Sequence, residues 1–109
     1  MRIHNKLGKG FKEVVYKDAL EFELIKEIIP YEREKEFFVR YGNKVLDRKF
    51  NADFYVFDSI ILEIKASSEI RSDNFRQTLN YLKTSQIKLG IIINFGTDKL
   101  QYQRVICTF

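Results

Sequence analysis

The sequence has few of the residues from which many enzyme sites are built. Cys107 is the only cysteine and His4 the only histidine among 109 residues. These counts exclude an internal disulfide, a Cys/His zinc cage and a Ser-His-Asp triad built on a histidine in the middle of the chain. The single cysteine favours an intracellular, reducing environment.

Long hydrophobic runs are also missing. The longest apolar segments, such as GIIINF at 90–95, fall far below the ~20 residues that a membrane-spanning helix needs. The N-terminal residues MRIHNKLGKG contain no apolar signal core. We therefore expect a soluble, cytoplasmic protein.

The length and the hydrophobic content of the chain fit one compact domain. A chain of 109 residues, 45% of them hydrophobic, is long enough for one core and too short for two ordinary domains. Residues 1–109 are therefore predicted to form a single domain. Nineteen Lys and Arg against fifteen Asp and Glu give a formal net charge of +4, which mildly favours a polyanionic partner.

The spacing of apolar residues predicts the order of helices and strands. Residues 11–29 repeat apolar positions at close to 3.6 residues, which predicts a helix that Pro30 ends. Residues 31–45 alternate like strands around a hairpin turn at Gly42-Asn43. Strands are then expected at 51–57 and 60–66, a helix capped by Ser72 or Asp73 at about 72–85, and two last strands at 89–96 and 100–109.

This order is helix, three or four antiparallel strands, helix, two strands. A helix that links the third strand to a later one is a crossover connection. The sequence therefore predicts an α/β fold of the α+β kind, with a mixed sheet flanked by helices.

Residues 51–66, NADFYVFDSIILEIKA, place three charged residues among strand-forming ones. Glu63 and Lys65 are two apart, so they share one face of a strand. If the two segments pair antiparallel through a three-residue connection or a β-bulge, Asp53 lies opposite Glu63, with α-carbons within about 5.5 Å. A strict two-residue turn would instead direct Asp53 to the other face.

Two carboxylates this close repel each other unless a proton or a cation lies between them, and a hard divalent metal such as Mg²⁺ fits that position. Lys65 would then orient a water molecule or stabilise charge on a phosphate. The alternative is that Asp53, Glu63 and Lys65 lie on a solvated sheet face, with Lys65 neutralising Glu63. The spacing alone does not separate these two interpretations.

The motifs and their order resemble the PD-(D/E)XK phosphodiesterase superfamily, whose core is helix, three antiparallel strands, helix, strand. Gly10, Glu13 and Tyr16 match the signature of the small GxxExxY family. KLGKG resembles that family's LGPG, ADFYV and ILEIKA resemble its two acidic strands, and RQTLNYLK and LGIIINFG resemble its last helix and strand. The likeness runs from about Leu7 to Phe95. Ala52 replaces the proline of the superfamily's name.

The resemblance implies a metal-dependent nuclease that hydrolyses nucleic-acid phosphodiester bonds. It implies that Asp53 and Glu63 bind Mg²⁺ or Mn²⁺, that Lys65 assists the water, and that Glu13 adds a further carboxylate. Gln77 on the second helix matches a glutamine of the exonuclease-like branch, with Tyr81 one turn further on; Tyr16 and Tyr81 would have supporting roles. The alternatives are that Glu13 is a first-turn acid, that Gln77 is simply exposed, and that both tyrosines are core or rim aromatics.

Several basic residues are expected to rim this site and to hold a nucleic-acid backbone, with DNA favoured over RNA: Lys9, Lys12, Lys44, Arg48, Lys49 and Arg76. The alternative is ordinary solvated charge.

The runner-up function is a catalytically inactive module of the same fold that binds nucleic acid or assembles with other proteins. The family's usual N-terminal helix is longer than the segment from Arg2 to Lys6, which suggests a homodimer in which a second copy covers apolar surface.

Overall fold

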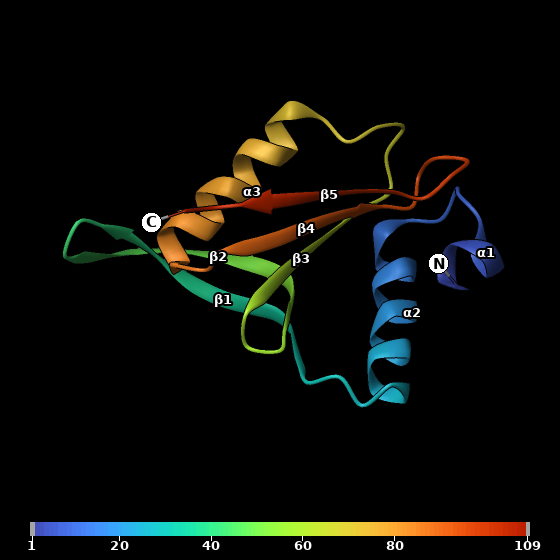
Figure 1. Ribbon diagram of the computed structural model, residues 1–109, viewed down its shortest axis with the longest axis horizontal. Helices are drawn as coiled ribbons and strands as arrows, with labels where there is room; N and C mark the ends of the chain where they lie inside the picture. Colours follow the sequence, from blue (N-terminus) through green and yellow to red (C-terminus); the bar gives the residue numbers. More distant parts are fainter. Residues whose placement is uncertain (1, 109) are drawn as a thin grey trace.

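The computed structural model describes residues 2–108, and Figure 1 shows their arrangement. The elements in chain order are α1 (Arg2–Leu7), α2 (Glu13–Lys26), β1 (Tyr31–Tyr41), β2 (Lys44–Val56), β3 (Ile60–Lys65), α3 (Ser72–Ser85), β4 (Leu89–Asn94) and β5 (Gln101–Ile106). The strands form one sheet in the order β1-β2-β3-β4-β5. β3 and β4 are parallel and the other neighbours are antiparallel. The predicted mixed sheet with a helical crossover is confirmed.

The helices differ from the sequence-based expectations at three points: the end of α2, the cap of α3 and the presence of α1. α2 ends at Lys26 rather than continuing to Pro30, because Ile28 adopts a left-handed conformation (φ 57°) and the Ile29 N–H donates to the Leu24 carbonyl. α3 has its predicted range, but Arg71 precedes it and donates its N–H to Asn74 Oδ1 (3.0 Å), so neither Ser72 nor Asp73 caps it. The short helix α1 was not expected.

The strands follow the predicted turns. Tyr41 pairs with Lys44, so Gly42-Asn43 forms the hairpin turn between β1 and β2. The segment expected as a separate strand from Asn51 is the second half of the 13-residue β2. Val56 pairs with Ile60 across residues 57–59, which confirms the three-residue connection.

One helix packs on each face of the sheet. α2 contributes Tyr16, Leu20 and Leu24 to a cluster with residues of β2 and β3, including Phe54 and Ile64. On the other face, Leu82 of α3 packs with Ala52, Ile61, Ile92 and Val105. β2 and β3 are therefore held from both sides where they lie next to each other, which fixes the backbone around Asp53 and Glu63.

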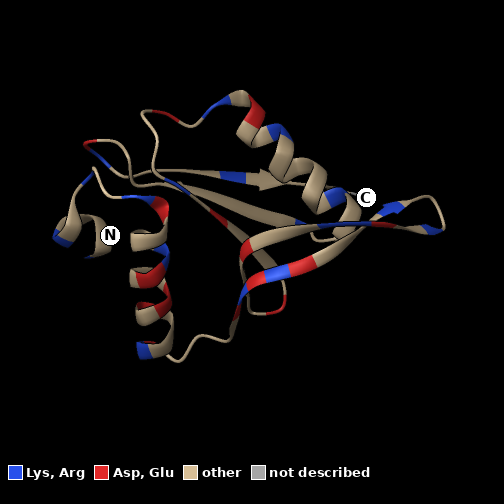
Figure 2. Cartoon of the chain, turned by 180° about the vertical axis from the view of Figure 1, so that it is seen from behind, with Lys and Arg blue, Asp and Glu red and all other residues tan. Residues whose placement is uncertain are grey.

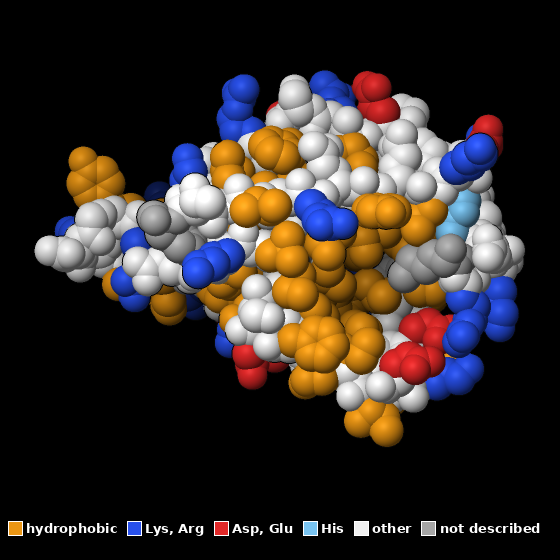
Figure 3. Space-filling model, viewed as in Figure 1, with side chains coloured by type: hydrophobic (Ala, Val, Ile, Leu, Met, Phe, Trp, Pro, Cys, Tyr) orange, Lys and Arg blue, Asp and Glu red, His pale blue; other side chains and the backbone are white. Residues whose placement is uncertain are grey.

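The face of the sheet opposite α3 is only partly covered by α2. Figure 3 shows hydrophobic side chains gathered over its centre. On β5, Tyr102 and Ile106 are exposed on this face, with Arg104 between them. Within residues 2–108, no helix combines the length and the apolar character needed to cross a membrane.

Candidate active site

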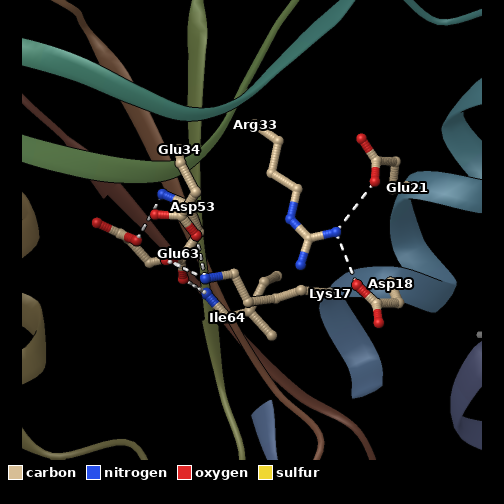
Figure 4. Close-up of polar contacts among 8 residues, drawn as sticks. All are labelled: Lys17, Asp18, Glu21, Arg33, Glu34, Asp53, Glu63 and Ile64. Atoms are coloured by element: carbon tan, nitrogen blue, oxygen red, sulfur yellow. Dashed lines mark hydrogen bonds and ion pairs between the residues drawn. The ribbon is translucent and has the colours of Figure 1, made fainter. Parts of the chain in front are cut away.

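Asp53 and Glu63 meet where β2 and β3 separate. Phe54 pairs with Leu62 in the ladder, so Asp53 and Glu63 are next in register. Here side chains replace the ladder: the Asp53 N–H donates to Glu63 Oε2 (3.2 Å) and the Ile64 N–H donates to Asp53 Oδ2 (2.7 Å) (Figure 4). The register predicted from the three-residue connection is confirmed, and it brings the two carboxylates to one point.

The Glu63 side chain is almost fully buried, at 6% exposed. Burial, and secondly the negative charge of Asp53, raise the pKa of Glu63 to about 8, while Lys65 opposes part of this rise. Two repelling carboxylates, one of them buried, form an all-oxygen donor pair that a hard divalent cation would stabilise. The residues present therefore fit Mg²⁺ or Mn²⁺.

The third carboxylate expected from the sequence is not brought to this pair. Within residues 2–108, no group of three or more His, Cys, Asp or Glu side chains is arranged to hold a metal ion. Glu13 is exposed in the first turn of α2. The expectation that Glu13 completes the ligand set with Asp53 and Glu63 is corrected here, because Lys17, one turn further along, is the α2 residue that reaches Asp53.

Lys17 links α2 to two strands. Its Nζ lies 3.1 Å from Asp53 Oδ1 and also contacts the Glu34 carboxylate on β1. Burial alone would lower the pKa of Lys17, but the hydrogen bonds to Glu34 and Asp53 raise it above the usual value. Lys17 and Glu34 were not predicted from the sequence, although the position of Lys17, four residues after Glu13, indicates that it shares that helix face.

Of the two α3 residues predicted for the site, Tyr81 lies near the carboxylates, and Gln77 is exposed beside Tyr81. The Tyr81 ring stacks on Phe50 with centroids 3.9 Å apart. Burial first, then the charges of Glu63 and Asp53, raise the pKa of Tyr81, and the neighbouring Gln77 offsets part of the rise. The Tyr81 hydroxyl is therefore close enough to the carboxylates to respond to their charge.

Lys65, the last residue of β3, is held in place by the chain that follows it. No ion pair of Lys65 is found among the described residues, so its ammonium group is available. The buried Asn94 on β4 accepts from the Ser67 and Gly96 N–H groups (both 3.0 Å) and donates to the Ser67 carbonyl (2.9 Å). A Cβ at Gly96 would clash with the backbone of Ala66 and Ser67. No local pattern in the chain indicates the contact between Gly96 and residues 66–67.

Tyr16 lies in the core and makes no contact with the carboxylate pair. Its hydroxyl donates to the Gly8 carbonyl (2.6 Å), and its ring stacks on Phe95 with centroids 4.6 Å apart. Gly10 in the same loop has φ 109°, a conformation that favours glycine. Tyr16 therefore fixes the turn that leads into α2, which agrees with the core alternative considered for it.

The basic residues expected to rim the site come from separate parts of the chain. Lys9 pairs with Asp98 (2.7 Å), while Lys12 and Arg76 are exposed near the starts of α2 and α3. Lys44 precedes Asp53 by nine residues on one continuous strand, a separation of roughly 30 Å at ~3.3 Å per residue. Arg48 and Lys49 lie on the same outer part of β2. Lys44 therefore does not rim the site, because β2 extends away from it instead of folding back, while Arg48 and Lys49 as part of the rim stay predictions.

The chain matches a known protein family and resembles a solved structure in its fold. A family model described as "PD-(D/E)XK nuclease superfamily" matches residues 1–105. Among solved structures, the crystal structure of SSO0001 matches with a TM-score of 0.66 at 24% sequence identity, over 87% of this chain and 50% of that one. This chain therefore spans half the length of SSO0001, and at this identity the likeness shows the fold alone. No curated protein matches.

Proposed function

The chain belongs to the PD-(D/E)XK nuclease superfamily, and we propose on that premise that it hydrolyses nucleic-acid phosphodiester bonds with Mg²⁺ or Mn²⁺ held by Asp53 and Glu63. The superfamily typically uses divalent metals. The observation that carries the proposal is the pair of hydrogen bonds in which each carboxylate accepts an N–H from the other strand. They direct both acids to the gap between β2 and β3, and Lys65 lies on the same strand two residues after Glu63.

A bound metal would lower the pKa of an attacking water and stabilise charge on the phosphate. Lys65 orients that water and stabilises the negative charge that develops on the phosphoryl oxygens. The Tyr81 hydroxyl, with its raised pKa, stays protonated at neutral pH and donates a hydrogen bond to a phosphate oxygen. Lys17 holds the Asp53 carboxylate in position through the contact to Oδ1.

The test is a cleavage assay on single-stranded, duplex and branched DNA and on RNA, with Mg²⁺ or Mn²⁺ present. Asp53→Asn and Lys65→Ala are each expected to lose about a hundredfold or more of the activity, because the first removes a metal ligand and the second removes the ammonium group that acts on the water and the phosphate. Asp73→Asn and Lys88→Ala, at exposed positions away from the site, are matched controls that keep it. Equal cleavage by all preparations would indicate a contaminating nuclease and contradict the proposal.

One observation favours the runner-up, an inactive module that retains the fold and binds nucleic acid or another protein. Lys17 already compensates the charge of Asp53, and the described residues supply only two clustered carboxylates. If the chain is such a module, we expect it to bind nucleic acid without cleaving it, whichever divalent metal is present. The same assay, run beside a binding measurement, separates the two functions.

A further inference from the structure

The outer part of the β1–β2 hairpin, residues 38–49, projects from the sheet and is called here the hairpin arm. β2 pairs with β3 only at residues 54–56, so the arm has no strand neighbour beyond its own two strands. It forms one end of the molecule's longest dimension, 46 Å (Figure 1). Tyr41, beside the turn, is 76% exposed.

Positive charge is concentrated on the arm. It carries Arg40, Lys44, Arg48 and Lys49 against one acid, Asp47, a net charge of +3 where the whole chain has +4. All five side chains are exposed, and of the four basic residues only Lys49 has an ion pair among the described residues, with Glu36 at 3.4 Å. Figures 2 and 3 show the basic residues along this projecting end.

A groove separates the arm from the C-terminal end of α3. It has a volume of about 360 Å³ and is lined by Arg40, Gly42, Asn80, Lys83, Thr84 and Gln86, with no acidic residue. The Arg40 N–H donates to Thr84 Oγ1 (2.6 Å), which fixes the arm to the helix. Lys83 therefore adds a positive charge from α3 to those of the arm.

The base of the arm is rigidly connected to the carboxylate site. Phe37 and Phe50, paired across the hairpin, stack with centroids 5.3 Å apart, and Phe50 stacks in turn on Tyr81. Leu82, the residue after Tyr81 on α3, packs with Ala52, the residue before Asp53 on β2. The distance from the arm's charges to the carboxylates is therefore set by packed aromatic rings.

We propose that the hairpin arm docks the phosphate backbone of duplex DNA to one side of the cleavage point, an inference that rests on the proposed nuclease function. The ~30 Å between Lys44 and Asp53 along β2 corresponds to about nine base pairs at ~3.4 Å each. A duplex is stiff over this length and holds its phosphates at a fixed distance from the site, whereas a single strand does not. Lys and Arg contacts to phosphates give affinity without sequence preference.

The test measures binding without divalent metal, using labelled DNA duplexes of 8 and 24 base pairs and single strands of equal length. The triple variant Arg40→Gln, Lys44→Gln and Arg48→Gln is expected to bind the long duplex about tenfold or more weakly, with the slope of log affinity against log salt reduced by about 2 to 3. On the short duplex the loss should be much smaller. Lys44→Gln alone, at the turn and least able to disturb folding, should show a smaller loss in the same direction.

The matched control is Lys26→Gln, Lys99→Gln and Arg104→Gln, three exposed positions away from the arm that remove the same charge. Equal weakening by both triples, or an arm effect confined to single strands, would overturn the docking surface. Arm-dependent duplex binding with no cleavage by any preparation would support the surface and contradict the nuclease. Cleavage of the long duplex that the arm triple leaves unchanged would contradict the surface and support the nuclease.

Discussion

At the scale of single residues, the fold changes the acid chemistry of Glu63. Its side chain is buried, and the Asp53 carboxylate lies beside it. Burial first and that charge second raise its pKa to about 8, from an ordinary value of 4.5. Without metal, the folded protein therefore holds a proton on this pair at neutral pH, and the unfolded chain does not.

This difference gives a pH prediction for the metal-free protein. Between about pH 4.5 and 8 the folded state binds more protons than the unfolded state at Glu63, so its contribution to stability is present at low pH and is lost as the pH rises through 8. One residue changes the free energy of unfolding by at most about 1.4 kcal/mol per pH unit. We expect urea unfolding with EDTA, measured from pH 5 to 8.5, to show that the free energy of unfolding of Glu63→Gln falls less with rising pH than that of the wild type.

The matched control is Glu69→Gln, which changes an exposed glutamate in the same way and should leave the wild-type pH slope intact. Parallel curves for the wild type and Glu63→Gln would show that Glu63 does not retain its proton in the folded protein.

Also at the residue scale, Lys17 shows what the motif left out. The sequence pointed to Glu13 because it lies within the Gly-x-x-Glu-x-x-Tyr signature. Both residues lie on one face of α2, one turn apart. The packing of Tyr16 against Phe95 and Gly8 sets which turn of α2 lies level with Asp53, and Lys17 is the residue that reaches it. The Gly-x-x-Glu-x-x-Tyr signature does not predict which turn of α2 lies beside Asp53, because that depends on how the helix packs.

At the scale of elements, the parallel pair β3 and β4 holds the Glu-x-Lys segment. Lys65 pairs with Asn94 in the ladder, and the Phe95 N–H donates to the Lys65 carbonyl (2.9 Å). The Asn94 side chain uses both acceptor positions and both donors, the second donor going to Gln101 Oε1 (3.2 Å). This one buried amide connects the ends of β3 and β4 to the start of β5.

Replacing Asn94 with alanine should therefore destabilise the protein by about 2 to 4 kcal/mol, because four hydrogen bonds of roughly 1 kcal/mol each are lost. Any cleavage activity should fall as well, since the chain after Lys65 loses its anchor. Asn5→Ala, at an exposed position on α1, is the control and should change the free energy of unfolding by less than about 0.5 kcal/mol. Equal unfolding curves for the two variants would show that the Asn94 contacts contribute nothing to stability.

At the scale of the whole molecule, binding of a metal at one point should stabilise the entire fold, because the carboxylates come from two strands that carry both cores. At Mn²⁺ concentrations tenfold above Kd, the stability should rise by about 1.4 kcal/mol, which raises Tm by roughly 5 to 10 °C for a chain of this size. Asp53→Asn should abolish the shift in a thermal melt at pH 8, and Asp73→Asn should retain it. A shift of the same size in both variants would place the metal elsewhere.

The shape of the molecule adds a second consequence at this scale. The arm lies at one end of the 46 Å axis, while β3, the strand that carries Glu63, lies nearer its centre (Figure 1). A substrate that contacts both must extend over about 3 nm. The charge of the molecule follows the same axis, since most of its net positive charge is on the arm.

The sequence by itself determined the order of the elements, the hairpin turn at Gly42-Asn43 and the register that places Asp53 opposite Glu63. These depend on local spacing, on turn residues and on the two-residue period of a strand, all of which are present in the chain order. The length of the connection between Val56 and Ile60 was enough to align the two acids. For the same reason, α3 was predicted with its observed range from its apolar period.

Only the tertiary structure decided which other residues surround the two acids. Lys17, Glu34 and Asn94 come from three different elements, and their positions depend on how the helices and strands pack together. The location of Lys44, Arg48 and Lys49 was also decided there, because whether β2 continues straight or folds back depends on its pairing with β1 over the whole length. Such positions follow from packing between residues distant in sequence, and no local pattern in the chain records them.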